Sequence, residues 1–272
     1  MESSKAIDRI LKLRAEIARH DELYHREAKP VISDYDYDQL KYELVALEAE
    51  HPELSLEESP LNKVGDDRLE GFSTYRHRSL MQSLDNTYSE VELRNFHARV
   101  VRLLGEEQSF SYVVEPKLDG VAVSLTYERG KLIRAVTRGN GIEGDDVTEN
   151  VRTIRSLPQQ LAGDSHPDVI EIRGEIYMTN AEFVRINQGR AEAGLETYAN
   201  PRNLTAGTIK QLDRSEVAKR KLEIVLYGLG YCEPLIVTAQ SDYQNLLKSW
   251  GLPVVEKFWR AGNIDVVWEK IT

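Results

Sequence analysis

Two runs of alternating apolar and β-branched residues, at 121–127 and 132–137, constrain the fold of this chain more than any other feature. Their period of two predicts β-strands, and the loop Glu-Arg-Gly-Lys at 128–131 predicts a hairpin between them. Further strands are expected at 169–178 and 222–229. Because helical segments are interspersed too irregularly for βαβ units, we predict an α+β fold built on an antiparallel sheet.

Helical periodicity dominates the first part of the chain. Apolar residues share one face over 5–27, and Ser33 with Asp36 has the pattern of a capping box that begins a second helix. Two such helices make a hairpin too small to be a core alone, so we expect an appendage that packs on the remainder or moves against it. Pro, Gly and acidic residues then predict a linker over 52–75. Later helices are predicted at 89–104, from Thr179 onward, and at 241–250.

Composition limits the class of protein. With 41% hydrophobic and 29% charged residues among 272, and no apolar stretch near the roughly 20 residues of a membrane span, the chain has the pattern of a soluble protein. The single cysteine, Cys232, excludes an internal disulfide and a multi-cysteine zinc site within this sequence. No signal-peptide core follows Met1, so we expect a cytoplasmic protein without membrane contact.

The formal net charge of −10 means that the surface as a whole repels nucleic acid. Contact with DNA would need a local basic face. Six basic residues are candidates for such a face: Arg202, Lys210, Arg214, Lys219, Arg220 and Lys221. Asp213 and Glu216 balance part of their charge, so an ordinary solvated face is equally consistent with this set.

The hexapeptide Glu-Pro-Lys-Leu-Asp-Gly at 115–120 stands just before the first alternating run. Lys117 is a candidate nucleophile, but it must lose its proton first, and neighbouring cations or desolvation would favour that loss. Glu115 and Asp119 alone would have the opposite effect, so they make chemical sense if they hold a metal ion, a ribose or a base. A surface lysine paired with two carboxylates is the plainer alternative.

Residues 139–144, Gly-Asn-Gly-Ile-Glu-Gly, match the dinucleotide fingerprint G-x-G-x-x-G. A functional fingerprint opens an apolar helix in a βαβ unit. Here Asp145 and Asp146 follow, and two carboxylates repel a pyrophosphate. We therefore interpret these glycines as a tight loop after Arg138.

Two further groups of residues have a functional and a structural interpretation. On a strand, Glu171, Arg173 and Glu175 point to one face, which is either a binding row or a solvated face. In the helical hairpin, rings and carboxylates are spaced to bind a flat cationic ligand, although core tyrosines with solvated aspartates are the favoured alternative. These residues are Tyr24, His25, Asp34, Tyr37 and Asp38.

Read in order, these stretches resemble the N-terminal part of bacterial NAD-dependent DNA ligases, over nearly the whole chain. The resemblance rests on the motifs above together with Met-Gln-Ser-Leu-Asp-Asn at 81–86, Gly-Asp-Asp-Val-Thr-Glu-Asn at 144–150 and Asn-Pro-Arg-Asn at 200–203. The ordered set is far more specific than any one member. It implies a helical nicotinamide-binding subdomain with its linker, 1–65, and an antiparallel-sheet nucleotidyltransferase domain of the DNA ligase and capping-enzyme type, 66–272.

The resemblance also implies roles. Lys117 would attack the α-phosphate of NAD, form a lysine-linked AMP and expel nicotinamide mononucleotide, with Asp119 helping to hold the site and any Mg²⁺. The hairpin residues Tyr24, His25, Asp34, Tyr37 and Asp38 would hold the nicotinamide mononucleotide half. The expected adenine contacts are Ser83, Leu84 and Glu115, and the expected ribose contacts are Arg138 and Glu175. The longer enzyme would seal nicked double-stranded DNA, and we expect a monomer.

Several departures from the family pattern stand out. Leu80 replaces a usual proline, Asn140 a common aspartate, and Lys210 an arginine at an expected phosphate contact. The family continues past Thr272 with two lysines near the α-phosphate, then with a zinc site and further domains. The adenylation domain is therefore expected to be incomplete at its C-terminal end. We predict that this chain binds NAD, self-adenylates slowly and does not itself seal DNA.

Two alternatives remain from sequence. An ATP- or GTP-using nucleotidyltransferase shares Lys-x-Asp-Gly, but its triphosphate leaving group needs no nicotinamide-binding hairpin. A catalytically silent nucleotide-binding module is the other, and the presence of Lys117 with its surrounding charged residues counts against it.

Overall fold

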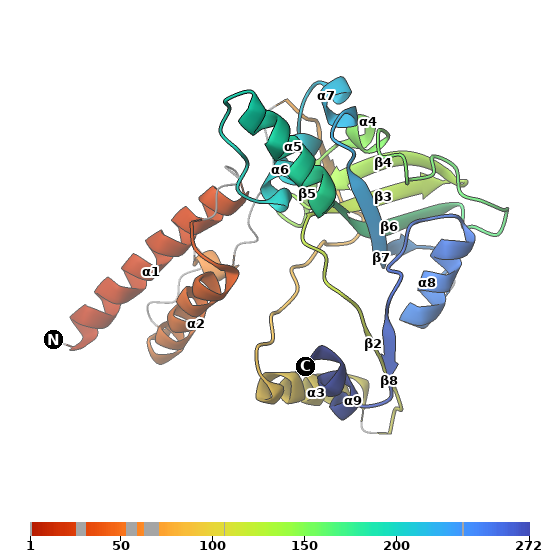
Figure 1. Cartoon of the computed structure of the whole chain (residues 1–272). Coiled ribbons are helices and arrows are strands. Elements are labelled where there is room, and N and C mark those ends of the chain that lie inside the picture. Colours follow the sequence, from red (N-terminus) through yellow and green to blue (C-terminus); the bar gives the residue numbers. More distant parts are fainter. Residues whose placement is uncertain (1, 26–30, 53–58, 63–70, 106, 236) are drawn as a thin grey trace.

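A computed structural model describes all residues except 1, 26–30, 53–58, 63–70, 106 and 236. The main body is an antiparallel sheet with strand order β4-β3-β6-β7 (Figure 1). Its strands are β3 (Val121–Glu128), β4 (Lys131–Thr137), β6 (Val169–Tyr177) and β7 (Glu223–Cys232). The predicted α+β class, the hairpin and the strands near 169–178 and 222–229 are therefore confirmed.

The register of the two central strands decides where the functional residues meet. β3 pairs with β6 along its whole length, with Val121 opposite Ile176 and Ala122 opposite Glu175. The start of β3 therefore lies beside the end of β6. This pairing brings the hexapeptide at 115–120, which leads into β3, next to Glu175, although the two are far apart in sequence.

The central strand β3 is buried on both faces, whereas alternation alone would predict one buried face. From Val123 to Tyr127 every residue of β3 is buried, because helices and loops cover the sheet. Tyr127, Ile172 and Trp250 are among the largest buried side chains of this core. The surrounding helices are α4 (Thr148–Val151), α5 (Asn180–Glu192), α6 (Pro201–Ile209), α7 (Arg214–Ala218) and α8 (Gln240–Ser249).

The N-terminal hairpin is α1 (Glu2–His25) and α2 (Asp34–Glu50), which lie beside the main body in Figure 1. Its small core contains Ile10, Leu13, Ile17 and Leu44, and a short 3₁₀ helix, η2 (Pro60–Asn62), packs against it. Ser33 caps α2 as predicted, since its Oγ accepts the backbone N–H of Asp36 at 3.1 Å.

The predicted linker over 52–75 is wrong at its end. Residues Thr74–Arg76 form β1, which pairs with β5 (Glu143–Asp145). Pairing with a partner about seventy residues away gives no local periodicity, so the strand was missed. The predicted boundary between residues 65 and 66 falls within 63–70, outside the described residues.

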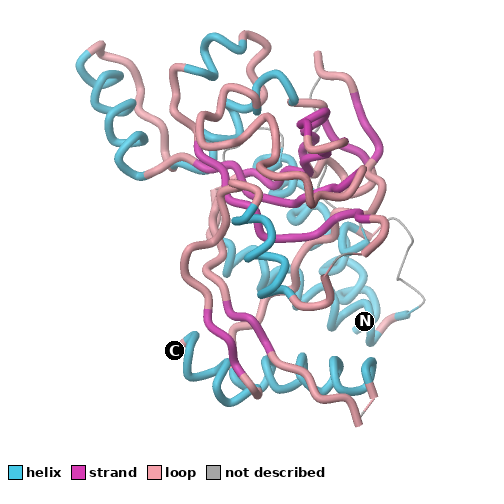
Figure 2. Tube along the Cα trace, turned by 90° about the vertical axis from the view of Figure 1, so that its right-hand side faces the viewer, coloured by secondary structure: helices cyan, strands magenta, loops and turns pink. Residues whose placement is uncertain are grey.

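A third group of elements extends from the sheet (Figure 2), namely α3 (Glu90–Leu104), β2 (Tyr112–Val114), β8 (Trp259–Ala261) and α9 (Ile264–Ile271). The predicted helix at 89–104 is confirmed as α3, with Ser89 as its cap. β2 pairs with β8, and Leu93, Ala261, Ile264 and Val267 form a small separate core. Among the described residues, no helix is both long and apolar enough to cross a membrane.

Candidate functional site

The turn that carries Lys117 is fixed by a close backbone approach at Gly120. A Cβ on this glycine would lie 2.1 Å from the carbonyl oxygen of Ile176 and 3.1 Å from Glu175 Cγ. Only a residue without a side chain fits this contact. Lys117 itself, three residues earlier, is exposed.

Arg202 holds the same turn from α6. Its Nε lies 3.0 Å from the Gly120 carbonyl oxygen, to which it donates, and 2.9 Å from Asp119 Oδ1. Burial lowers the pKa of Arg202 to about 10, which still leaves the guanidinium charged at neutral pH. Arg202 is therefore no member of an exposed basic patch. Sequence reasoning missed its role because the contact spans 82 residues.

Glu175 lies in the electrostatic field of Lys117. Burial raises the pKa of Glu175 to about 7, while the Lys117 charge and hydrogen bonds from Gly120 and Tyr227 oppose that rise. The Tyr227 hydroxyl donates to Glu175 Oε2 at 3.4 Å, and burial raises the pKa of this phenol, so it stays protonated at neutral pH. Sequence reasoning missed Tyr227, whose only signal was a polar aromatic ring within an aliphatic strand.

Glu115 is held by helix α8. Gln240 Nε2 donates to its carboxylate at 3.3 Å, and the buried Gln244 amide donates to the same oxygen. Burial raises the pKa of Glu115, and the two amides oppose the rise. Gln240 also donates to the Tyr227 carbonyl oxygen at 2.5 Å. Glu115, Tyr227 and Glu175 therefore belong to one connected group.

Arg138, which directly follows β4, joins this group to the segment that carries Ser83 and Leu84. Arg138 Nη1 donates to Ser83 Oγ at 3.1 Å, and its charge acts on Tyr227. The Leu84 side chain is 74% exposed, so its apolar surface is accessible to a ligand. The structure thus brings together six of the seven main-body residues singled out from sequence, with Leu84 directly beside them.

The glycine loop after Arg138 is a tight turn, as interpreted from sequence. Gly139 and Gly141 have φ of 56° and 86°. A Cβ on Gly139 would lie 1.9 Å from the Glu143 carbonyl oxygen. No apolar helix follows, because Glu143–Asp145 form β5. The G-x-G-x-x-G pattern is therefore not a Rossmann fingerprint.

The five residues predicted in the helical hairpin do not share one environment. Tyr24 and His25 lie at the end of α1 and Asp34 begins α2, but their side chains are not among those that the structure describes. Tyr37 donates to Asp21 at 2.5 Å and packs against the hairpin core. Burial, with this hydrogen bond, raises the pKa of Tyr37.

Asp38 instead faces the main body. Its Oδ2 accepts a hydrogen bond from Asn86 Nδ2 at 2.6 Å and another from the Tyr88 hydroxyl. The Tyr35 ring meets Tyr88 edge to face, at 5.8 Å between centroids. α2 is therefore attached to the same segment that carries Ser83.

Comparison with known proteins identifies the family of this chain. A family model described as the NAD-dependent DNA ligase adenylation domain matches residues 69–272, and one described as the DNA ligase-like N-terminal NAD+-binding domain matches residues 3–65. The chain belongs to the NAD-dependent DNA ligase family. The resemblance inferred from the sequence motifs is confirmed.

Curated relatives agree. DNA ligase 1 of Opitutus terrae is 59% identical over 272 residues, covering 98% of this chain and 40% of its own length. DNA ligase 2 of the same organism is 46% identical, with 98% and 38% covered. A DNA ligase of Pseudomonas putida strain F1 is 45% identical, with 94% and 33% covered. The chain therefore spans 40% or less of the length of these three ligases.

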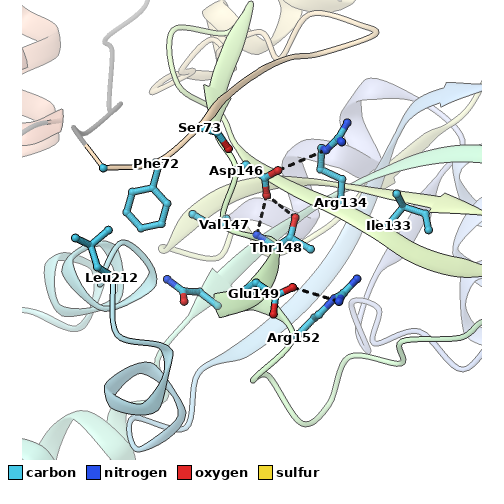
Figure 3. Close-up of a pocket in the computed structure, with 12 residues that line it drawn as sticks. Phe72, Ser73, Ile133, Arg134, Asp146, Val147, Thr148, Glu149, Arg152 and Leu212 are labelled. Carbon is cyan, nitrogen blue, oxygen red and sulfur yellow. Dashed lines mark hydrogen bonds and ion pairs between the residues drawn. The ribbon is translucent and has the colours of Figure 1, made fainter.

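The larger pocket of this ligase-family chain lies elsewhere (Figure 3). It has a volume of about 500 Å³ and is lined by Phe72, Leu212 and charged residues of β4 and α4. Its arginines are already matched by carboxylates, at 3.5 Å between Arg134 and Asp146 and 3.2 Å between Arg152 and Glu149. None of the residues assigned to NAD from sequence lines this pocket, so its size does not identify the site.

The expectation that Lys210 contacts a phosphate is wrong. Lys210 Nζ lies 3.1 Å from Asp145 Oδ2, and the two side chains are only 7% and 1% exposed. Lys210 therefore contacts a buried carboxylate and is not a surface cation for a phosphate or for DNA. Arg214 and Lys219 pair with Glu149 and Glu216, so the six candidate basic residues do not form a patch of uncompensated charge.

The metal expected from the family was tested on the residue geometry. Within the described ranges, no three His, Cys, Asp or Glu side chains converge as metal ligands. The Asp119 carboxylate contacts Arg202. The described residues alone therefore do not form a Mg²⁺ site.

Proposed function

We propose that Lys117 of this chain takes AMP from NAD, and that the surrounding group of residues is the NAD site. The observation that carries the proposal is the fixed geometry of the Lys117 turn. Gly120 contacts Glu175 on one side and Arg202 on the other. Fixing this turn limits the positions that Lys117 can take, and positioning of the nucleophile is the main requirement of phosphoryl transfer.

The reaction balances as follows. The Lys117 ammonium releases a proton to water, and the resulting amine attacks the α-phosphorus of NAD. A nitrogen–phosphorus bond forms as the bond from that phosphorus to the bridging oxygen breaks, and nicotinamide mononucleotide leaves with the electron pair. Lys117 then carries AMP. Arg138, which contacts Ser83, would supply positive charge that offsets charge on the phosphate, while Arg202, paired with Asp119, holds the turn.

The AMP half of NAD would lie over the main-body group. Ser83, Leu84 and Glu115 would contact the adenine, and Arg138 with Glu175 the ribose. Glu175 suits this role, because with a pKa of about 7 it accepts a hydroxyl hydrogen bond once ionised. Asp119 would hold the turn through Arg202.

The nicotinamide half would lie against the helical hairpin, on Tyr24, His25, Asp34, Tyr37 and Asp38. One observation supports this placement. Asp38 already contacts the segment after Ser83 through Asn86 and Tyr88, and rings with carboxylates attract a flat cationic nicotinamide.

The wider role follows from the relatives named DNA ligase. We infer that this adenylation region serves nick sealing in double-stranded DNA, as part of DNA replication and repair, in a cytoplasmic enzyme. We also propose that the enzyme uses Mg²⁺ and is a monomer. The proposed domains of this chain are 1–65 and 66–272, and its self-adenylation is proposed to be slow.

Intact-mass spectrometry after incubation with NAD and Mg²⁺ tests the proposal. We expect the mass of one AMP to be added from NAD, not from ATP, and not to a Lys117→Ala variant. An adduct from ATP alone would identify an ATP-using nucleotidyltransferase instead. An NAD-dependent rise in melting temperature without an adduct would show binding without chemistry, and neither adduct nor rise would refute the NAD site.

A further inference from the structure

The segment at 77–84 crosses the sheet without regular secondary structure, yet its path is tightly fixed. The His77 and Met81 N–H groups donate to the carbonyl oxygens of Ile142 and Gly141, each at 2.9 Å. The Met81 side chain is 4% exposed. Two contacts therefore attach this segment to the glycine loop, just before Ser83 and Leu84.

Between those two contacts, the segment is held by β6. The Glu171 side chain is 3% exposed, and Arg78 Nε lies 3.9 Å from its Oε1. Arg173, two residues later on the same face, donates from Nη2 to Ser79 Oγ at 2.7 Å, to the Leu80 carbonyl oxygen at 2.8 Å and to the Ser79 carbonyl oxygen at 3.2 Å. Hydrogen bonds from a charged guanidinium are the stronger kind.

The Arg173 side chain lies against β7. Arg173 stands opposite Gly228. A Cβ on Gly228 would lie 3.4 Å from Arg173 Cβ, and one on Gly230 would lie 3.5 Å from Arg173 Nε, both ordinary contact distances. The guanidinium therefore lies along the sheet face and reaches the segment.

The row of Glu171, Arg173 and Glu175 is thus neither a solvated face nor a simple ligand site. Its first two members hold the segment that leads to Ser83, and its third lies in the field of Lys117. One strand face therefore fixes the distance between the base-contacting segment and the nucleophile.

We propose that Arg173 is a positioning residue that determines base selectivity, by fixing the path of residues 79–84 and with it the position of Ser83 at the proposed adenine site. This inference rests on the proposed NAD site. Hypoxanthine carries an oxygen where adenine carries the amino group, so the hydrogen-bond pattern at that edge is reversed. A segment released from Arg173 would adapt to either base, and selectivity would fall.

The test compares NAD with nicotinamide hypoxanthine dinucleotide. Dissociation constants for both are measured by calorimetry on the unmodified chain, on Arg173→Lys and Arg173→Met, and on Arg152→Lys as the control. Arg152 also donates to a backbone carbonyl oxygen, that of Leu132 at 3.1 Å, but it lies at the other pocket. Hydrogen exchange at residues 79–84 is followed in the same proteins.

We expect the preference for NAD to fall by about fivefold or more in both Arg173 variants, with faster exchange at 79–84. The Arg152 variant should keep the original preference. Arg173 variants that bind both dinucleotides more weakly but in the original ratio, with unchanged exchange at 79–84, would overturn the inference, as would an unmodified chain that does not discriminate. Failure of the unmodified chain to bind NAD would instead refute the proposed function, and this inference with it.

Discussion

Replacing Gly120 with alanine tests whether the Lys117 turn depends on close backbone packing. The added Cβ would lie 2.1 Å from the Ile176 carbonyl oxygen and 3.0 Å from its carbon. Ordinary contacts between a carbon and a carbonyl oxygen begin at about 3.3 Å, so the backbone segments at Gly120 and Ile176 would have to separate by about 1 Å. We expect a loss of about 1–3 kcal/mol of unfolding free energy, typical of overpacking.

The effect on chemistry should be of the same size as the effect on stability, about 2.7 kcal/mol of activation free energy for a hundredfold loss of rate. A displacement of about 1 Å at a reacting group lowers a rate by about a hundredfold. The same shift would disturb the Gly120 contacts with Glu175 and Arg202, which orient the turn. Self-adenylation followed by intact mass, together with thermal unfolding, measures both effects.

Gly189→Ala is the matched control. Gly189 lies within α5, and a Cβ there has nothing within 4 Å. Alanine should raise stability by about 0.5–1 kcal/mol through helix propensity and leave adenylation unchanged. A Gly120→Ala protein that unfolds and reacts like the unmodified chain would refute the reasoning.

Two further predictions concern charge and domain contact. Burial raises the pKa of Glu175 to about 7. Between pH 4.5 and 7 this group therefore stays protonated in the folded chain while it ionises in the unfolded chain. As the pH rises through this range, the unfolding free energy falls by up to about 1.4 kcal/mol per pH unit. Glu175→Gln should flatten that slope in denaturant titrations, and an unchanged slope would contradict the assigned pKa. Tyr88→Phe removes one of the two hydrogen bonds to Asp38, so hydrogen exchange on the face of α2 near Asp38 should speed up while exchange in β3 stays the same. Identical exchange in α2 would show that this contact does not hold the hairpin in solution.

Local sequence patterns predicted much of the fold. Period-two alternation located β3 and β4, apolar residues at helical spacing located α3, and capping residues located the starts of α2 and α5. These features depend on neighbours within a few residues, so the sequence displays them directly. Short elements such as β1, β8 and α9 were missed, because each is stabilised by partners distant in the chain.

The ordered motifs also predicted the family and the identity of the candidate nucleophile. They did not reveal what each charged group contacts. Arg202 and Lys210 had the same appearance in sequence, yet one holds the Gly120 carbonyl and the other a buried aspartate.

The sequence by itself therefore determined the longer strands and helices and the family, and it singled out Lys117 as the candidate nucleophile. Only the tertiary structure decided that Gln244 holds Glu115, that Arg202 holds Gly120 and that Arg173 holds Ser79, across 129, 82 and 94 residues. The physical reason is one of range. Hydrogen bonds within an element repeat with its period, whereas contacts across the sheet depend on strand register and on which backbones approach closely enough to exclude a side chain.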